Sequence, residues 1–217
     1  MNVEQARFNM IEQQIRPWEV LDQQVLDLLF VVKREDYVPA AYKALAFADM
    51  EIPLGQGQTM LAPKIEARLL QELAVKKTDK VLEVGTGSGY MAALLAARAE
   101  YVVTVEINPE IAEMAQANIA RSGVRNVLVE VGNGARGWAA RAPYDVIVVS
   151  ASVPEVPAEL LAQLRVGGRL AVIAGTAPAM EAQLITCTAE GVFNTVNLFE
   201  TVVPPLQAVA APSTFEF

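Results

Sequence analysis

The stretch VLEVGTGSGY, residues 81–90, decides the fold of this chain. It starts with a short apolar run, typical of a buried strand, and leads through three alternating glycines into the apolar, helix-like residues 90–99. Glycines at such a turn allow a tight backbone path and let a ligand approach the N-terminus of the following helix. The stretch therefore predicts a strand–turn–helix unit that binds a ligand.

Strands and helices alternate downstream of this unit. Strands are expected at residues 101–106, 126–131, 144–150 and 169–175, helices at 108–123 and 157–164, and a terminal hairpin or meander at 183–206. Asn108 is placed to cap the first of these helices, with Pro109 in its first turn and Gly123 at its end. Strands joined by helices of this length imply right-handed crossovers and a parallel sheet covered on both faces.

The first third of the chain has a helical pattern. An opening helix would place Phe8, Ile11 and Ile15 on one face. Asp22 can cap a second helix, and a third can begin at Pro63. Between the second and third helices lies the loop GQGQTML, which starts with small and polar residues and ends with two bulky apolar ones.

Composition excludes several classes of function. The 217 residues are 53% hydrophobic, which favours one globular core over a disordered chain. A net charge of −8 argues against a nucleic-acid partner, which needs a basic surface. With no histidine and one cysteine, Cys187, the chain offers no disulfide framework, no Cys/His metal site and no histidine catalysis. No signal peptide and no membrane-spanning apolar run is evident, so we expect a cytoplasmic protein with no membrane partner.

Two acidic residues make the glycine turn informative. Glu83 comes two residues before the first glycine, where a carboxylate suits a cationic ligand better than a phosphate. Glu106 ends the second expected strand, where it can accept hydrogen bonds from both ribose hydroxyls of a nucleotide. The alternatives are a plain glycine-rich turn with a solvated glutamate, and the dinucleotide site of an oxidoreductase.

Six stretches then resemble, in order and approximate spacing, the protein-L-isoaspartate O-methyltransferases. They are REDYVP, IPLGQGQTMLAP, VLEVGTGSGY, GNGARGW, APYDVIVVSASVPEVP and QLRVGGRLAVIAG. The resemblance implies an α/β, Rossmann-like class I methyltransferase with a mostly parallel seven-stranded sheet. Residues 1–78 would be an N-terminal helical region carrying the acceptor loop, packed as one compact unit on a cofactor-binding core of residues 79–217.

The resemblance also implies roles for individual residues. Gln58 and Thr59 would be the catalytic residues of the acceptor pocket, and Met60 and Leu61 would belong to the substrate pocket. The cofactor, S-adenosylmethionine, would contact Glu83, Gly85, Thr86, Gly87, Gly89, Glu106, Ile107, Asn133 and Gly134, and no metal is expected.

The implied activity is methyl transfer to the free carboxylate of isoaspartyl residues in damaged proteins, a repair reaction. That carboxylate is already ionised at neutral pH, so no catalytic base is required and the missing histidine is no objection. The protein would supply alignment and desolvation, and the methyl ester would collapse to a succinimide without enzymatic help. Peptides or proteins that contain isoaspartate are the implied partners.

Several positions depart from the family pattern or allow two readings. Leu61 stands where the family loop ends in a serine hydroxyl, and the lost donor could cost an anionic acceptor about 2–3 kcal/mol. Asn133 replaces an aspartate that accepts from the adenine amine, and it is either an uncharged acceptor or a turn residue. Lys64 either supplies a compensating positive charge for the anionic acceptor or is a solvated lysine. Trp138 either forms part of the wall of the cofactor site or only packs against its neighbours.

Three interpretations therefore stay open. The chain is an isoaspartyl methyltransferase with activity that Leu61 weakens, a diverged methyltransferase for another acceptor such as a small molecule, or a cofactor-binding protein with little catalysis. Leu61 and Asn133 favour the second and third, and the other motifs favour the first. The sequence does not set the oligomeric state.

Overall fold

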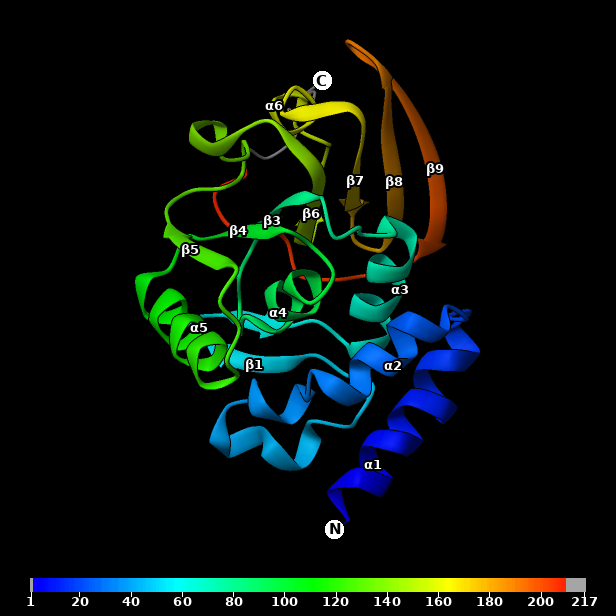
Figure 1. Ribbon diagram of the computed structural model, residues 1–217, viewed down its shortest axis with the longest axis vertical. Coiled ribbons are helices and arrows are strands. Elements are labelled where there is room, and N and C mark those ends of the chain that lie inside the picture. The colour runs from blue at the N-terminus through cyan, green and yellow to red at the C-terminus, as the bar shows by residue number, and fades with distance from the viewer. Residues whose placement is uncertain (1, 210–217) are drawn as a thin grey trace, which may run out of the picture.

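The computed structural model describes residues 2–209 and is built on a seven-stranded sheet in the order β5-β4-β3-β6-β7-β8-β9 (Figure 1). Strands β5 to β7 of that order pair in parallel, and β8 and β9 are antiparallel. The strands are β3 (Lys80–Val84), β4 (Tyr101–Glu106), β5 (Val127–Val131), β6 (Tyr144–Val153), β7 (Leu164–Thr176), β8 (Ala179–Ala189) and β9 (Val192–Glu200). The predicted α/β fold class is confirmed.

The helices follow the alternation that the sequence predicts. They are α1 (Val3–Met10), α2 (Gln23–Val31), α3 (Pro63–Leu73), α4 (Tyr90–Ala96), α5 (Pro109–Arg121) and α6 (Ala158–Leu161). The side chains of Asp22 and Asn108 accept backbone N–H bonds at the starts of α2 and α5, as expected for N-caps. Helix α6 is shorter than the expected helix at 157–164, because the chain enters β7 at Leu164.

Alternate residues of the central strands face two separate cores. On β3, Val81 packs into the core that contains α3, α4 and the N-terminal helices, whereas Leu82 packs into the core that contains Leu160 of α6. Side chains of successive strand residues point to opposite faces, and both faces here are covered. The near-continuous apolar runs of β3, β4 and β6 follow from this double burial.

The N-terminal segment departs from a simple helix. Helix α1 continues into a π-helical turn (Ile11–Ile15) and a 3₁₀-helix (Arg16–Trp18). Ile11 and Ile15 are fully buried, but the expectation for Phe8 was wrong, because its side chain is 47% exposed. The π turn Ile11–Ile15 departs from the regular α-helical spacing on which the expected shared face of Phe8, Ile11 and Ile15 was based.

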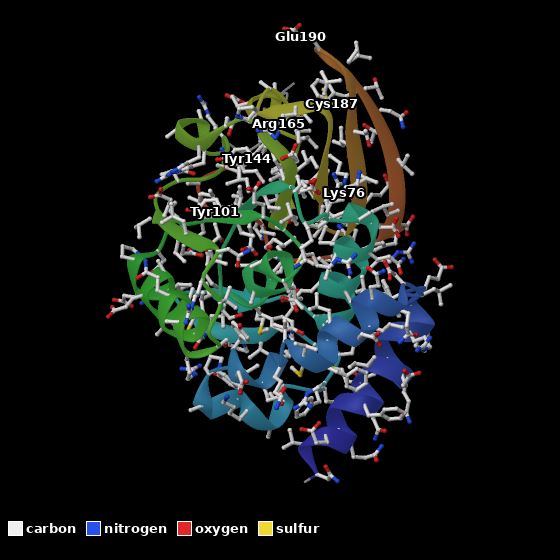
Figure 2. All side chains as sticks on the ribbon, viewed as in Figure 1. Lys76, Tyr101, Tyr144, Arg165, Cys187 and Glu190 are labelled. Carbon is white, nitrogen blue, oxygen red and sulfur yellow. The ribbon has the colours of Figure 1, made fainter. Side chains whose placement is uncertain are left out.

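Two hairpins complete the fold. The loop expected at residues 55–61 contains a small hairpin of β1 (Ile52–Gly55) and β2 (Gln58–Met60). Strands β8 and β9 form a long hairpin at one edge of the sheet, with Glu190 at its tip (Figure 2). Within residues 2–209, the helices all fall short of the length and apolarity that crossing a membrane requires.

Candidate functional site

The candidate site is a pocket at the carboxyl ends of β3, β4 and β6, where the ends of parallel strands meet at one edge of the sheet. The β1–β2 hairpin and the segment after β9 complete its walls. The pocket is lined by Gln58, Thr59, Val84, Gly85, Gly87, Val105, Glu106, Ile107, Asn133, Gly134, Ala135, Ser150, Ala151, Leu206 and Gln207.

A smaller chamber adjoins this pocket beneath the hairpin. It shares Thr59, Gly85, Gly87 and Ser150 with the pocket. Its other walls are Met60, Leu61, Glu66, Glu83, Thr86, Ser88 and Met91. Apart from Gly89, the predicted cofactor residues and the predicted acceptor residues thus line these two adjoining cavities.

The glycine turn after β3 has the conformation that its sequence requires. Gly85, Gly87 and Gly89 all have positive φ, at 91°, 53° and 82°, which side chains rarely adopt. A Cβ on Gly87 would lie 3.3 Å from a methyl group of Leu54, so the hairpin packs directly on this turn. Gly89 is the N-cap of α4, and of the predicted site residues within 2–209 it alone lines neither cavity.

Glu106 is held rigidly at the end of β4. One carboxylate oxygen accepts from the backbone N–H of Gly87 at 3.0 Å, and the other accepts from the N–H of Asn108 at 3.1 Å. Each oxygen keeps a further lone pair, and Glu106 lines the pocket with 5% of its surface exposed. The carboxylate can therefore accept hydrogen bonds from a ligand with two neighbouring hydroxyls.

Glu83 is completely buried, and its hydrogen-bond partners are neutral hydroxyls. Thr104 donates to one carboxylate oxygen at 2.7 Å and Ser150 donates to the other at 2.9 Å. Burial raises the pKa of Glu83 to about 8, against the lowering effect of the bonds from Thr104 and Ser150. The hydroxyls of Thr86 and Thr104 are also hydrogen-bonded to each other, 2.7 Å apart. An acid in this setting is a natural partner for a positively charged ligand.

The hairpin places its polar and apolar residues differently. Gln58 and Thr59 line the pocket, and the hydroxyl of Thr59 donates to Glu51 at 3.3 Å. Burial raises the pKa of Glu51, and the bond from Thr59 opposes that rise. Met60 and Leu61 line the chamber but are only 3% and 4% exposed, because both also pack into the main hydrophobic core.

The remaining predicted positions fall into two groups. Ile107, Asn133 and Gly134 line the pocket, and the side-chain oxygen of Asn133 accepts from the backbone N–H of Ala135 at 2.9 Å. Trp138 packs in the core on the far face of the sheet, where its ring would lie 2.8 Å from a Cβ on Gly132.

Lys64 lies outside both cavities. Its ammonium group pairs with Asp49 at 2.7 Å and sits 4.1 Å from the centre of the Trp18 ring. It is therefore engaged elsewhere in this structure and does not offer a charge to the pocket.

Sequence reasoning missed three residues that matter to the geometry. Ser150 ends the apolar run of β6, and a polar residue at that position of a predicted parallel strand was a usable signal. Leu206 and Gln207 reach the pocket because the chain after β9 returns beside β6, with Ser152 paired to Pro205. That return is a long-range contact, and no local pattern indicates it.

Comparison with known proteins identifies relatives along nearly the whole chain. The model of the family described as Protein-L-isoaspartate(D-aspartate) O-methyltransferase matches residues 5–207. A protein-L-isoaspartate O-methyltransferase of Methanoculleus marisnigri is 45% identical over 169 residues, which cover 78% of this chain and 77% of that protein. Protein-L-isoaspartate O-methyltransferase 1 of Syntrophobacter fumaroxidans is 40% identical over 195 residues, with 90% and 91% covered.

Solved structures agree with this fold. A chain described as a protein-L-isoaspartate O-methyltransferase superposes with a TM-score of 0.77 at 27% identity, covering 92% of this chain and 65% of that longer one. A Plasmodium falciparum chain described as a beta-aspartate methyltransferase, solved with S-adenosyl-L-homocysteine, gives a TM-score of 0.79 at 21% identity, with 95% and 99% covered.

Proposed function

This chain belongs to the protein-L-isoaspartate(D-aspartate) O-methyltransferase family, and we propose that it methylates the free α-carboxylate of isoaspartyl residues in damaged proteins. The methyl donor is S-adenosylmethionine. The observation that carries the proposal is that the glycine turn, Glu106 and the hairpin residues Gln58 and Thr59 line a single pocket. A donor site and an acceptor site must adjoin for a direct transfer.

The residues fit this cofactor. When bound, S-adenosylmethionine supplies a methyl group on a positively charged sulfur. The buried carboxyl of Glu83, with two neutral hydroxyl partners, suits the positive end of that ligand. Glu106 offers two oxygens to the ribose hydroxyls, and Asn133, Ile107 and Gly134 line the pocket where the adenine would lie.

The acceptor side works by position and by exclusion of water. We assign Gln58 and Thr59 to hold the substrate carboxylate, with Met60 and Leu61 closing the chamber beside it. The carboxylate is ionised at neutral pH, so the protein needs no base to remove a proton. Burial beneath an apolar hairpin removes water from the carboxylate and aligns its oxygen for attack.

Three wider assignments accompany this function. Residues 1–78 serve as an acceptor-binding region packed on a cofactor-binding core of residues 79–217, supported by the hydrophobic core that runs through both. The macromolecular partners are proteins or peptides that contain isoaspartate. The proposed site of action is the cytoplasm, and fractionation of cells that express a tagged chain tests this.

A labelled-methyl transfer assay tests the activity. The purified chain is incubated with radiolabelled S-adenosylmethionine and an isoaspartyl peptide, beside the same peptide with a normal aspartyl linkage. We expect base-labile label on the isoaspartyl peptide only. Equal labelling of the two peptides, or none of either by a protein that binds the cofactor, would refute the proposed acceptor.

A further inference from the structure

Arg34 is a fully buried arginine that lies one layer behind the proposed site. It begins the 3₁₀-helix Arg34–Asp36, has 0% of its surface exposed, and lines neither the pocket nor the chamber. Removing a guanidinium from water costs several kcal/mol unless its partners are well placed. The complete burial of this charged side chain therefore needs a physical explanation.

The guanidinium of Arg34 connects three separate segments. One nitrogen donates to the backbone carbonyl of Leu61, at the exit of the hairpin, at 2.7 Å. Another pairs with Glu66 in the first turn of α3, whose side chain is also buried. The planar group lies over the ring of Tyr90, the first residue of α4 after the glycine turn, with its carbon 5.5 Å from the ring centre.

These three segments are the walls of the chamber beneath the hairpin. Leu61 and Glu66 line that chamber themselves, and Tyr90 follows directly on the glycine turn that contributes Gly85 and Gly87. Met60 and Thr59 precede Leu61 by one and two residues, respectively. Fixing the carbonyl of Leu61 therefore also restricts the position of Thr59 relative to the glycine turn.

Stability alone is a poor explanation for this arrangement. Replacing a buried ion pair by apolar residues of similar size is often neutral or stabilising, so such pairs are weak evidence for stability. Around Arg34 the free-energy cost of burying polar groups is especially high, because its Nε atom and the hydroxyl of Tyr90 are buried without hydrogen-bond partners in the part of the chain described. A planar group that holds a carbonyl, a carboxylate and a ring at once does, however, define one geometry.

We propose that Arg34 is a positioning residue for methyl transfer, which holds Thr59 and Met60 in register with the glycine turn through Leu61, Glu66 and Tyr90. The inference rests on the proposed function. Its contacts reach the acceptor side of the site, whereas Glu106 and Asn133 lie on β4 and after β5 with their own hydrogen bonds. Loss of Arg34 should therefore impair transfer much more than cofactor binding.

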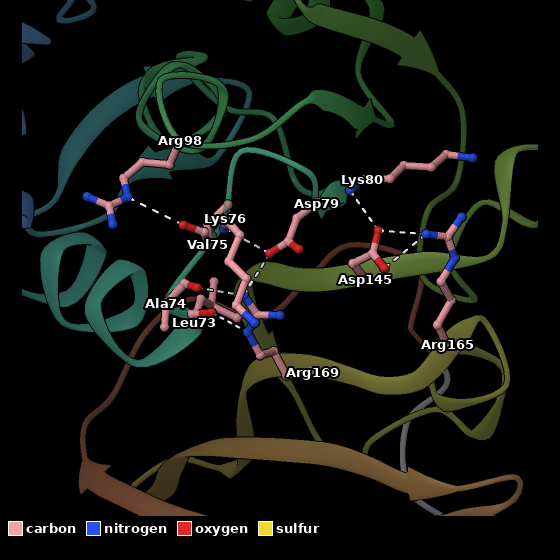
Figure 3. A network of polar contacts seen from close by, with 10 residues as sticks. All are labelled: Leu73, Ala74, Val75, Lys76, Asp79, Lys80, Arg98, Asp145, Arg165 and Arg169. Carbon is pink, nitrogen blue, oxygen red and sulfur yellow. Dashed lines mark hydrogen bonds and ion pairs between the residues drawn. The ribbon is translucent and has the colours of Figure 1, made fainter.

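The test compares Arg34→Met with a matched control, Arg169→Met. Arg169 also holds backbone carbonyls, those of Leu73 and Ala74, and pairs with Asp79 at 2.8 Å, but it does so at the opposite end of α3 (Figure 3). Each variant is assayed with an isoaspartyl peptide well below its melting temperature. We expect kcat/KM to fall about 30-fold or more for Arg34→Met, mostly in kcat, with cofactor Kd within about threefold. Arg169→Met should lower Tm and change kcat/KM less than about threefold.

Conservative variants keep the proposal testable if Arg34→Met does not fold. Arg34→Lys can reach Leu61 or Glu66 but not both in the planar arrangement, so its kcat/KM should lie between those of wild type and Arg34→Met. Glu66→Gln retains a hydrogen-bond acceptor for Arg34, so its kcat/KM should fall less than that of Arg34→Lys. Wild-type kcat/KM in a folded Arg34→Met or Arg34→Lys protein would overturn the proposal.

Hydrogen exchange separates this inference from the proposed function. Amide exchange of residues 52–62, measured with S-adenosylhomocysteine present, should be about tenfold faster or more in the Arg34 variants and unchanged in Arg169→Met. If wild type fails to methylate isoaspartyl peptides, the proposed function fails, and this exchange still reports whether Arg34 positions the hairpin. Equal protection of residues 52–62 in wild type and Arg34 variants would contradict the positioning role.

Discussion

Glu83 and Glu106 show how two glutamates meet different surroundings in adjoining cavities. Both are buried acids at the ends of neighbouring strands. Glu106 accepts from two backbone N–H groups. Glu83 meets only hydroxyls and the charges of other acids in the described structure, so burial dominates and raises its pKa to about 8. We propose that Glu106, which lines the pocket, binds the ribose and that Glu83, which lines the chamber and has neutral partners, lies at the cationic end of the cofactor.

The first prediction concerns Glu106. Glu106→Ala removes a charged acceptor and should weaken S-adenosylmethionine binding by about 2 kcal/mol, roughly 30-fold in Kd. Titration calorimetry of the variant beside wild type measures this. Glu113→Ala, which removes the same charge from an exposed position on α5, should bind normally. An unchanged Kd in a folded Glu106→Ala protein would rule out this assignment.

Leu61 shows why bulky apolar residues end a polar loop. Its side chain is 4% exposed and belongs to the main core, while its carbonyl accepts from Arg34. The residue therefore anchors the hairpin to the N-terminal region in addition to lining the chamber. Stability and acceptor binding make different demands on this one position.

The second prediction separates those demands. Leu61→Ser and Leu61→Ala should each lower stability by about 2–5 kcal/mol through the cavity that they leave in the core. Leu61→Ser alone offers a hydrogen-bond donor to the substrate carboxylate, and we expect its kcat/KM for an isoaspartyl peptide to exceed that of wild type about 5- to 150-fold. Leu61→Ala is the control, because it opens similar space in the chamber without adding a hydroxyl. Equal rates for the two variants would show that a hydroxyl here is dispensable.

At the scale of elements, the β1–β2 hairpin is the part that joins the two sides of the site. Its two-residue turn, Gln56 and Gly57, has positive φ at both positions, as a type I′ turn requires. The side chain of Gln56 donates to Glu110 on α5 at 2.8 Å, and Leu54 packs on Gly87. The hairpin thus spans the site from α5 to the buried Arg34.

The third prediction tests that turn. Gly57→Ala places a side chain at φ of 72° with open space around its Cβ, so backbone strain alone should cost about 1 kcal/mol. Gly123→Ala, at φ of 73° after α5 and equally open, should cost a similar amount. Only Gly57→Ala should raise KM for an isoaspartyl peptide and speed amide exchange in residues 52–62. The same KM in both variants would argue against a role of the turn in acceptor binding.

At the scale of the whole molecule, the N-terminal region contains buried charges. Arg7 pairs with Glu35 and Arg34 pairs with Glu66, and both arginines are almost fully buried. Burial raises the pKa of Glu66 to about 7, against the lowering effect of the charge of Arg34. Global stability should therefore depend on pH well above the usual range of carboxyl groups.

The fourth prediction gives the sign of that dependence. The pKa of Glu83 is raised from 4.5 to about 8 in the folded protein, so between these values the folded state binds more protons than the unfolded state. The free energy of unfolding without cofactor should fall as pH rises through that interval, by up to about 1.4 kcal/mol per pH unit. Urea unfolding of wild type and Glu83→Gln at pH 5, 6.5 and 8 measures the contribution, with the pH values chosen to span that interval. The variant should lose much of the slope, and parallel curves for the two proteins would contradict a neutral, buried Glu83.

Local signals in the sequence predicted the elements and their order. Apolar runs bounded by glycine, and caps such as Asp22 and Asn108, depend on neighbours a few residues away, so they can be read without the fold. The parallel sheet followed from the alternation of those elements. Glu83 and Glu106 could be assigned to one site because parallel strands end at one edge of a sheet.

Only the tertiary structure decided what surrounds those residues. Phe8 is exposed whereas Ile11 and Ile15, in the π turn that continues the first helix, are buried, and Lys64 pairs with Asp49 instead of facing the pocket. Ser150 and Leu206 reach the pocket, and Arg34 reaches the carbonyl of Leu61 behind it, through contacts between segments far apart in the chain. Periodicity and capping report a residue's own element, whereas burial, pKa and hydrogen-bond partners depend on which elements meet. The sequence by itself therefore determined the sheet and the edge at which the pocket lies, and packing determined which residues from distant segments surround that pocket.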